Sequence, residues 1–257
     1  MADFVKSNDE APSDYFALEA AGLRWLAVDG GVPCARVVAC DERSLTLERL
    51  VSVTPTREAA RDFGARLAVT HAAGAGFFGS APEGWHAAGY FGPLSGPLPM
   101  SLRGHETWGA FYAEERLLPM LRLADSRLGD AGIRAVEDVI ERCRAGDFDD
   151  GEPPARIHGD LWSGNVMWTP KGAVLIDPAA HGGHPETDLA MLDLFGCPHR
   201  EEVLAGYESV RPLRAGWRDR AGLHQLYPLL AHVVLFGRGY SRQAEQAAES
   251  ALAAPGC

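Results

Sequence analysis

The feature that most constrains this chain is the stretch Arg156–Pro178, which reads RIHGDLWSGNVMWTPKGAVLIDP. Two polar side chains, Asp160 and Asn165, stand five positions apart in a glycine-containing loop. The following residues, 166–176, alternate, turn at Thr-Pro-Lys-Gly and return as an apolar strand, which predicts a β-hairpin. That hairpin would bring Asp177 back beside the loop. We therefore expect Asp160, Asn165 and Asp177 to lie together.

The spacing D-x-x-x-x-N is that of the catalytic loop of protein kinases. There the aspartate accepts the proton of the substrate hydroxyl and the asparagine oxygen binds Mg²⁺. A second carboxylate, here Asp177, can hold Mg²⁺ against the nucleotide phosphates. The Gly-Asp turn alone is common, but the three side chains in this order and register predict a phosphotransferase. Asp160, Asn165 and Asp177 are its expected catalytic residues, Asn165 and Asp177 its metal ligands, and ATP and Mg²⁺ its cofactors.

Composition limits the partners of such an enzyme. The 257 residues suffice for one large domain or two lobes that share a cleft. Lysine and arginine number 24 against 35 acidic residues, a formal net charge of -11. A surface of this charge repels nucleic acid and anionic membranes, so neither is expected as a partner. It also repels ATP, so a nucleotide site needs local cations.

The five cysteines are scattered and form no C-x-x-C pair, so neither a zinc knuckle nor a disulfide framework is predicted. No signal peptide is recognisable, and no apolar run approaches the roughly 18 residues of a membrane span. These observations predict reduced thiols in a cytoplasmic protein. The apolar stretch 226–236 is expected to be a core helix.

Lys6 is one of only two lysines in the chain and follows two apolar residues at the end of a short predicted strand. Kinases need a strand lysine for the α- and β-phosphates and a helical glutamate that holds it. Glu19 lies in the middle of a helix predicted over 14–27. We expect Lys6 and Glu19 to pair and to contribute to nucleotide binding.

Two further strands are predicted over 35–40 and 45–50. The second would lead into a hinge, where the backbone of Glu48 and Leu50 is expected to face adenine. The predicted fold is therefore α+β and two-lobed, with a small β-rich N-terminal lobe over 1–51 and a mainly helical C-terminal lobe over 52–257. The helices expected in the larger lobe span 55–73, 108–123, 133–144, 186–194, 200–210, 217–237 and 241–254. The glycine- and proline-rich segment 74–103 is expected to be a long ordered loop.

Together these motifs resemble the fructosamine kinase (ketosamine-3-kinase) family, whose relatives include aminoglycoside phosphotransferases with a protein-kinase-like fold. The similarity extends over almost the whole chain, and its most specific part is the loop HGDLWSGN with its tryptophan. Other matching segments are 4–6, Glu19, 111–117, 176–179, 183–190 and 224–226.

The resemblance implies ATP-dependent phosphorylation of O3 of the ketose portion of a fructosamine or ribulosamine, small or protein-bound. In the family the 3-phosphate is unstable and releases the free amine, so the kinase acts in deglycation. By position, Asp160 is the base, and Trp162 and His158 are the expected substrate-binding residues. A monomer or weak dimer is expected.

One departure from the family concerns the N-terminal lobe. A kinase lobe begins with two strands and a glycine-rich loop before the lysine strand, and Lys6 stands too early for them. The lobe is therefore expected to be incomplete here, through a misassigned start or trimming rather than genuine loss of the loop.

Three alternatives stay open. Another small-molecule kinase of the aminoglycoside or choline phosphotransferase type would fit the acidic composition, although Trp162 argues against it. A pseudokinase would fit the absent glycine loop but not the intact Asp160, Asn165 and Asp177. A metallohydrolase using Asp177, His181 and His184 would need a further ligand, and His-x-x-His in a glycine-rich loop is not a helical metal pair.

Overall fold

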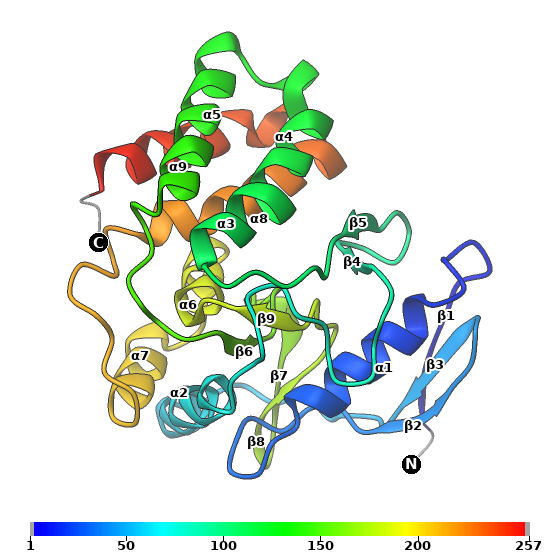
Figure 1. Cartoon of the computed structure of the whole chain (residues 1–257). Helices are drawn as coiled ribbons and strands as arrows, with labels where there is room; N and C mark the ends of the chain where they lie inside the picture. Colours follow the sequence, from blue (N-terminus) through cyan, green and yellow to red (C-terminus); the bar gives the residue numbers. More distant parts are fainter. Residues whose placement is uncertain (1–2, 255–257) are drawn as a thin grey trace.

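The computed structural model describes residues 3–254 and confirms the two-lobed α+β fold (Figure 1). The small lobe contains an antiparallel sheet in the order β1-β3-β2, with β1 at Phe4–Ser7, β3 at Ser44–Leu47 and β2 at Val37–Cys40. Helix α1 (Tyr15–Leu26) crosses this sheet. The strand predicted over 45–50 ends at Leu47, so Glu48 and Leu50 lie in the connection that follows it.

Helical and strand periodicity explain how this lobe is held together. Phe16, Ala20 and Leu23 recur on one face of α1, and Leu45 and Leu47 alternate on β3; all five are buried in one cluster. Val174 joins the same cluster; it comes from the stretch Arg156–Pro178, which we call the catalytic stretch after its predicted role. The position of α1 is therefore tied directly to the strand that leads to Asp177.

The predicted hairpin exists as β7 (Val166–Thr169) and β8 (Gly172–Leu175), paired from Val166–Leu175 to Thr169–Gly172. Leu175 also exchanges backbone hydrogen bonds with the segment before β2: its amide donates to Pro33 and its carbonyl accepts from Ala35. Two short strands that the sequence did not predict, β6 (Ala155–Ile157) and β9 (His181–Gly183), pair on either side of this stretch. The catalytic stretch is therefore fixed at both ends.

The larger lobe contains two groups of helices. Helix α2 (Arg57–Ala72) packs against α7 (Arg200–Glu208), where glycines permit close approach. A Cβ on Gly64 would lie 1.8 Å from the carbonyl oxygen of Val203, and one on Gly206 would lie 1.9 Å from that of Arg61. The other helices, with η for short helices that are not α-helical, are α3 (Trp108–Tyr112), η1 (Ala113–Leu117), α4 (Leu118–Ala124), η2 (Asp125–Arg127), α5 (Asp130–Ala145), η3 (Ser163–Asn165), α6 (Pro185–Leu194), α8 (Ala221–Phe236), η4 (Arg238–Tyr240) and α9 (Ser241–Ala253).

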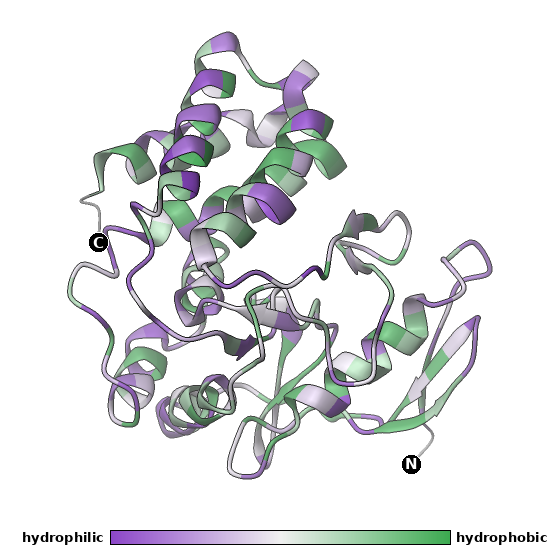
Figure 2. Ribbon diagram, viewed as in Figure 1, coloured by the Kyte–Doolittle hydropathy of each residue, from purple (hydrophilic) through white to green (hydrophobic). Residues whose placement is uncertain are grey.

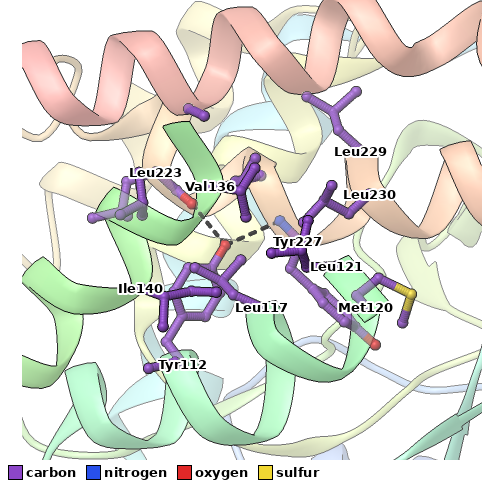
Figure 3. Close-up of a cluster of buried hydrophobic side chains, with 14 of the residues drawn as sticks. Tyr112, Leu117, Met120, Leu121, Val136, Ile140, Leu223, Tyr227, Leu229 and Leu230 are labelled. Atoms are coloured by element: carbon purple, nitrogen blue, oxygen red, sulfur yellow. Dashed lines mark hydrogen bonds between the residues drawn. The ribbon is translucent and has the colours of Figure 1, made fainter. Parts of the chain in front are cut away.

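The second group of helices comprises α3, α4, α5, α8 and α9. Its core surrounds α8, whose interior contains Pro228. The Tyr112 hydroxyl inserts into this helix, accepting a hydrogen bond from the Tyr227 amide (3.1 Å) and donating one to the Leu223 carbonyl (2.6 Å) (Figure 3). Proline has no N–H and disturbs the preceding turn, so a side-chain hydroxyl can enter there. Green apolar faces of these helices point towards one another in Figure 2.

The segment 74–103 was predicted to be a long loop, but it contains a short hairpin formed by β4 (Gly89–Phe91) and β5 (Leu98–Met100). Its turn begins at Gly92, which has a φ of +96° and lies against Leu235 of α8. A side chain at Gly92 would collide with Leu235, so this glycine lets the turn approach α8. In the part of the chain from residue 3 to 254, no helix is both long and apolar enough to cross a membrane.

Candidate active site

A cavity of about 460 Å³ lies between α1, the β4–β5 turn, the catalytic stretch and the C-terminal end of α8. Asp160, Asn165 and Asp177 all border it, as the sequence predicted, and so does the pair Lys6 and Glu19. The other lining residues are Tyr15, Leu18, Tyr90, Phe91, Gly92, Pro93, Leu94, Trp162, Pro178, Ala179, Met191, Phe195, His232, Leu235, Phe236 and Tyr240.

Lys6 connects the two lobes at this cavity. Its Nζ lies 2.9 and 2.8 Å from the two carboxylate oxygens of Glu19 and 2.9 Å from Oδ1 of Asp177. Burial alone would lower the pKa of Lys6, but the two carboxylates outweigh it and raise the pKa above its ordinary value. Lys6 is therefore a fixed positive charge beside Asp177.

Asp160 is held by Asn165, whose amide nitrogen donates to the Asp160 carbonyl (2.8 Å) and to its Oδ2 (3.1 Å). Burial raises the pKa of Asp160 to about 7, and the negative charges of Asp177 and Asp188 act in the same direction. The hydrogen bond from Asn165 opposes this shift without cancelling it. Asp160 is thus a carboxylate that binds a proton readily near neutral pH, a property suited to a general base.

Asp177 has an unusual backbone, with a φ of +54° two residues after the end of β8. Non-glycine residues are uncommon in this left-handed region, although aspartate and asparagine tolerate it best. The conformation turns the carboxylate, 46% exposed, towards Lys6 and the cavity. Strain of this kind persists where the surrounding structure enforces it.

The underside of the loop is anchored by Asp188 of α6, which is fully buried. Its Oδ2 accepts from the His158 amide (2.7 Å) and its Oδ1 from the Gly159 amide (3.0 Å), and His71 Nε2 lies 3.1 Å from Oδ2. These donors hold the pKa of Asp188 below its ordinary value despite burial. These bonds arise from tertiary packing and could not be read from sequence spacing.

His71 completes this anchor, as a buried and packed histidine rather than a catalytic one. Its Nδ1 lies 2.9 Å from the Tyr207 hydroxyl, so the ring bridges α7 and Asp188. Burial lowers the pKa of His71, which keeps the ring neutral. A neutral ring that donates from Nε2 to Asp188 accepts from Tyr207 at Nδ1.

Three predicted site residues do not reach the cavity. His158 is 1% exposed; its Nδ1 accepts from the Asp160 amide (3.2 Å) and its Nε2 donates to the Ile176 carbonyl (2.8 Å), so it supports the loop and the expected substrate contact is wrong. Glu48 and Leu50 also lie outside the lining. The Glu48 amide donates to the Arg36 carbonyl (3.0 Å), so it is not available to a nucleotide base.

Trp162 does border the cavity, with 39% of its surface exposed. Its indole lies across Gly164, where a Cβ would come within 2.2 Å of the ring, and it meets Phe195 edge-on at 6.2 Å. The sequence missed Tyr15 on the N-terminal side and His232, Phe236 and Tyr240 on the other. Only their aromatic character could have drawn attention to them.

The residues proposed for a metallohydrolase do not form a metal site. His181 Nδ1 donates to the Ala179 carbonyl (2.8 Å), and His184 accepts the Glu186 amide (3.2 Å) as the N-cap of α6. Between residues 3 and 254, the group with metal-like spacing is His184, Glu186 and His224. Both carboxylate oxygens of the buried Glu186 already accept hydrogen bonds from the Arg220 guanidinium, so this carboxylate is neutralised by a two-pronged ion pair.

The four cysteines within the described residues are free thiols: Cys34, Cys40, Cys143 and Cys197. Cys257 lies outside them. Burial raises the pKa of the Cys34 and Cys143 thiols to about 12, so neither is a reactive thiolate.

Known proteins provide an independent comparison. The family model described as fructosamine kinase matches residues 2–254. A probable ketoamine kinase from Synechocystis sp. is 35% identical over 254 residues, which cover 97% of this chain and 82% of that protein. A crystal structure of a candidate fructosamine-3-kinase from Thermobifida fusca is 49% identical, with a TM-score of 0.89 and coverage of 98% of this chain and 86% of that one.

More distant structures share the fold alone. A thermostable variant of an aminoglycoside phosphotransferase superposes with a TM-score of 0.55 at 16% identity, covering 96% of this chain and 86% of that one. The catalytic loop, the paired lysine and glutamate and the family match thus point the same way. The chain belongs to the fructosamine kinase family of small-molecule kinases.

Proposed function

We propose that this protein transfers the γ-phosphoryl group of ATP to O3 of the ketose portion of a ketosamine, a fructosamine or ribulosamine. The observation that carries the proposal is the position of Asp160 and Trp162, two residues apart on one loop, in the same cavity as the Lys6–Glu19–Asp177 cluster. A base, an aromatic surface for a sugar-amine and a cation for phosphate thus border one space.

Each residue of this chain has a separate task. Asp160 orients the ketose hydroxyl and accepts its proton as the bond to phosphorus forms. Lys6, held by Glu19, binds phosphate oxygens and compensates for the acidic surface. Catalysis of this type depends on positioning and electrostatic stabilisation, because a secondary alcohol is a weak nucleophile and no covalent enzyme intermediate is required.

The donor set at Asn165 and Asp177 fits Mg²⁺, which prefers carboxylate and carbonyl oxygens. The Asn165 nitrogen donates to Asp160, so its amide oxygen is the atom left for a cation. Asp177 is exposed to the cavity and is the other ligand. When bound, Mg²⁺ would neutralise phosphate charge during transfer.

The product explains a role in deglycation. A phosphate on C3 of a ketosamine stands next to the C2 carbonyl. Loss of a C1 proton and expulsion of phosphate from C3 give an imine at C1. Water hydrolyses this imine to a free amine and a 3-deoxy dicarbonyl sugar. The kinase step thus converts a stable adduct into one that decomposes.

We place this reaction in the cytoplasm and expect a monomer or weak dimer that acts on small or protein-bound ketosamines. The unpaired thiols and the net charge of -11 support this setting, since such a surface repels nucleic acid and anionic membranes.

The test is ATP turnover with Mg²⁺ and 1-deoxy-1-(methylamino)fructose, with the product identified by ³¹P and ¹H NMR. We expect a 3-phosphate, release of methylamine on standing, and a loss of at least about a hundredfold in kcat for Asp160→Asn. Asp193→Asn is the control, because Asp193 lies on α6, pairs with Arg200 and does not line the cavity.

Phosphate on another oxygen would overturn the regiochemistry. No turnover of any ketosamine, by this chain or by a form extended upstream, would overturn the proposed substrate and favour another small alcohol or a pseudokinase.

A further inference from the structure

The two ends of the cavity differ in chemistry. The carboxylates among its described lining residues are Glu19, Asp160 and Asp177, and they gather around Lys6 at the end formed by the small lobe. The opposite end is formed by α6, α8 and the turn η4, and none of the residues that these elements contribute to the lining is a carboxylate. A ligand that spans the cavity therefore meets charge at one end and aromatic rings at the other.

The aromatic end is a continuous series of rings that starts at the catalytic loop. Trp162 meets Phe195 at 6.2 Å between ring centroids, and Phe195 meets His232 at 4.9 Å. His232 in turn lies 5.2 Å from Phe236 and 5.0 Å from Tyr240. We call these five residues the aromatic wall. They belong to the catalytic loop, to the residue that follows α6, to α8 and to η4.

The wall is accessible. Trp162 is 39% exposed and Phe236 57%, although both are large apolar side chains that proteins usually bury. The His232 ring is fixed by a hydrogen bond from Nδ1 to the Pro228 carbonyl (2.7 Å), and burial lowers its pKa, which favours the neutral form. The wall thus presents π faces and no formal charge.

We propose that the aromatic wall binds the amine substituent of the ketosamine and selects apolar or aromatic substituents over cationic ones. This inference rests on the proposed function. Since the wall begins at Trp162, two residues from Asp160, a sugar whose hydroxyl lies at Asp160 would direct its C1 amine along the wall. The ketosamine ammonium would lie against ring faces, a favourable cation–π contact, and the group beyond it against Phe236 and Tyr240. A second positive charge there would find no carboxylate.

The test compares three fructose adducts that differ only in the amine: methylamine, benzylamine and 1,4-diaminobutane. For the natural chain we expect kcat/KM for the benzyl adduct to exceed that for the methyl adduct about tenfold, mainly through KM, because one ring is buried. The diaminobutane adduct should show no such gain. In Phe236→Ala and Tyr240→Ala, the benzyl-to-methyl ratio should fall towards one.

Two further variants make the result decisive. Phe236→Glu places a carboxylate at the end of the wall and should shift preference from the benzyl to the diaminobutane adduct. Phe77→Ala is the matched control, because Phe77 is 51% exposed and lies outside the cavity; its benzyl-to-methyl ratio should equal that of the natural chain.

The two proposals can fail separately. If no adduct is phosphorylated, the proposed function fails. If the methyl adduct is phosphorylated but the benzyl-to-methyl ratio is near one, or is unchanged by Phe236→Ala, Tyr240→Ala and Phe236→Glu, the kinase stands and the aromatic wall has no role in selection.

Discussion

Asp160 and Asp188 lie on opposite sides of one loop and differ in almost everything except chemical type. Asp188, beneath the loop, accepts two backbone hydrogen bonds and one from His71, and its pKa is held low. Asp160, above it, accepts a single side-chain hydrogen bond, and its pKa is raised to about 7. Donors, not burial alone, thus decide whether such a carboxylate stays ionised or binds a proton near neutral pH. The structure satisfies one completely and leaves the other reactive.

The largest expected effect on stability comes from replacing Asp188, the carboxylate that has a full set of hydrogen-bond donors. Asp188→Asn exchanges one acceptor oxygen for an amide that cannot accept from all three donors, so it should lower the free energy of unfolding by about 3–5 kcal/mol. Denaturant unfolding at pH 7 measures this. Asp193→Asn, on the same helix but exposed, should cost at most about 1 kcal/mol. Equal losses in the two variants would show that Asp188 is not an anchor.

Replacing Asp160 should change the free energy of unfolding in the opposite direction. The raised pKa of Asp160 means that its ionised form disfavours the folded state, and this penalty develops between the unfolded pKa, near 3.9, and about 7. Asp160→Asn removes the penalty and should raise the free energy of unfolding at pH 8 by about 2 kcal/mol, below the roughly 4 kcal/mol limit that the shift implies. The gain should shrink as the pH falls towards 5. A loss of stability at pH 8 would contradict the assigned environment.

The pH dependence of kcat/KM should report the ionisation of the same residue, Asp160. If Asp160 is the base, kcat/KM falls about tenfold per pH unit below pH 7, because only the deprotonated form accepts the hydroxyl proton. The pH–rate profile with the methyl adduct measures the inflection. His232 is another cavity residue that could titrate, but its lowered pKa lies away from 7, so His232→Gln should leave the inflection in place. A profile that is flat from pH 5.5 to 8 would exclude Asp160 as the titrating base.

Sequence patterns predicted the side chains that border the cavity better than the buried residues that hold the loop in place. Lys6 and Glu19 were paired because a strand lysine and a mid-helix glutamate are local features, and the 2.8 Å contact exists. Their part in phosphate binding stays a prediction. His158 was misjudged because its place in the motif HGDLWSGN suggested substrate contact, whereas the hydrogen bond that ties its ring to the Ile176 carbonyl depends on tertiary packing.

Non-local contacts explain the other misses. The aromatic wall combines the catalytic loop with the end of α8, and the β4–β5 turn, which approaches Leu235, lines the same cavity. Likewise, the anchor at Asp188 depends on His71, 117 residues earlier in the chain. No periodicity encodes such contacts.

The smallest effect tests backbone strain, which is found at Asp177 and not at Asp188. The φ of +54° at Asp177 is tolerated by asparagine but costs alanine about 1 kcal/mol. Both Asp177→Asn and Asp177→Ala remove the carboxylate from Lys6, so this loss cancels between them. Both should abolish turnover, and the alanine variant should melt about 2–4 °C below the asparagine variant. Equal melting temperatures would show that the loop relaxes, so that the strain is not enforced by the fold around it. A lower value for alanine would mean that the packing beneath the loop keeps a costly conformation at the residue proposed to bind metal.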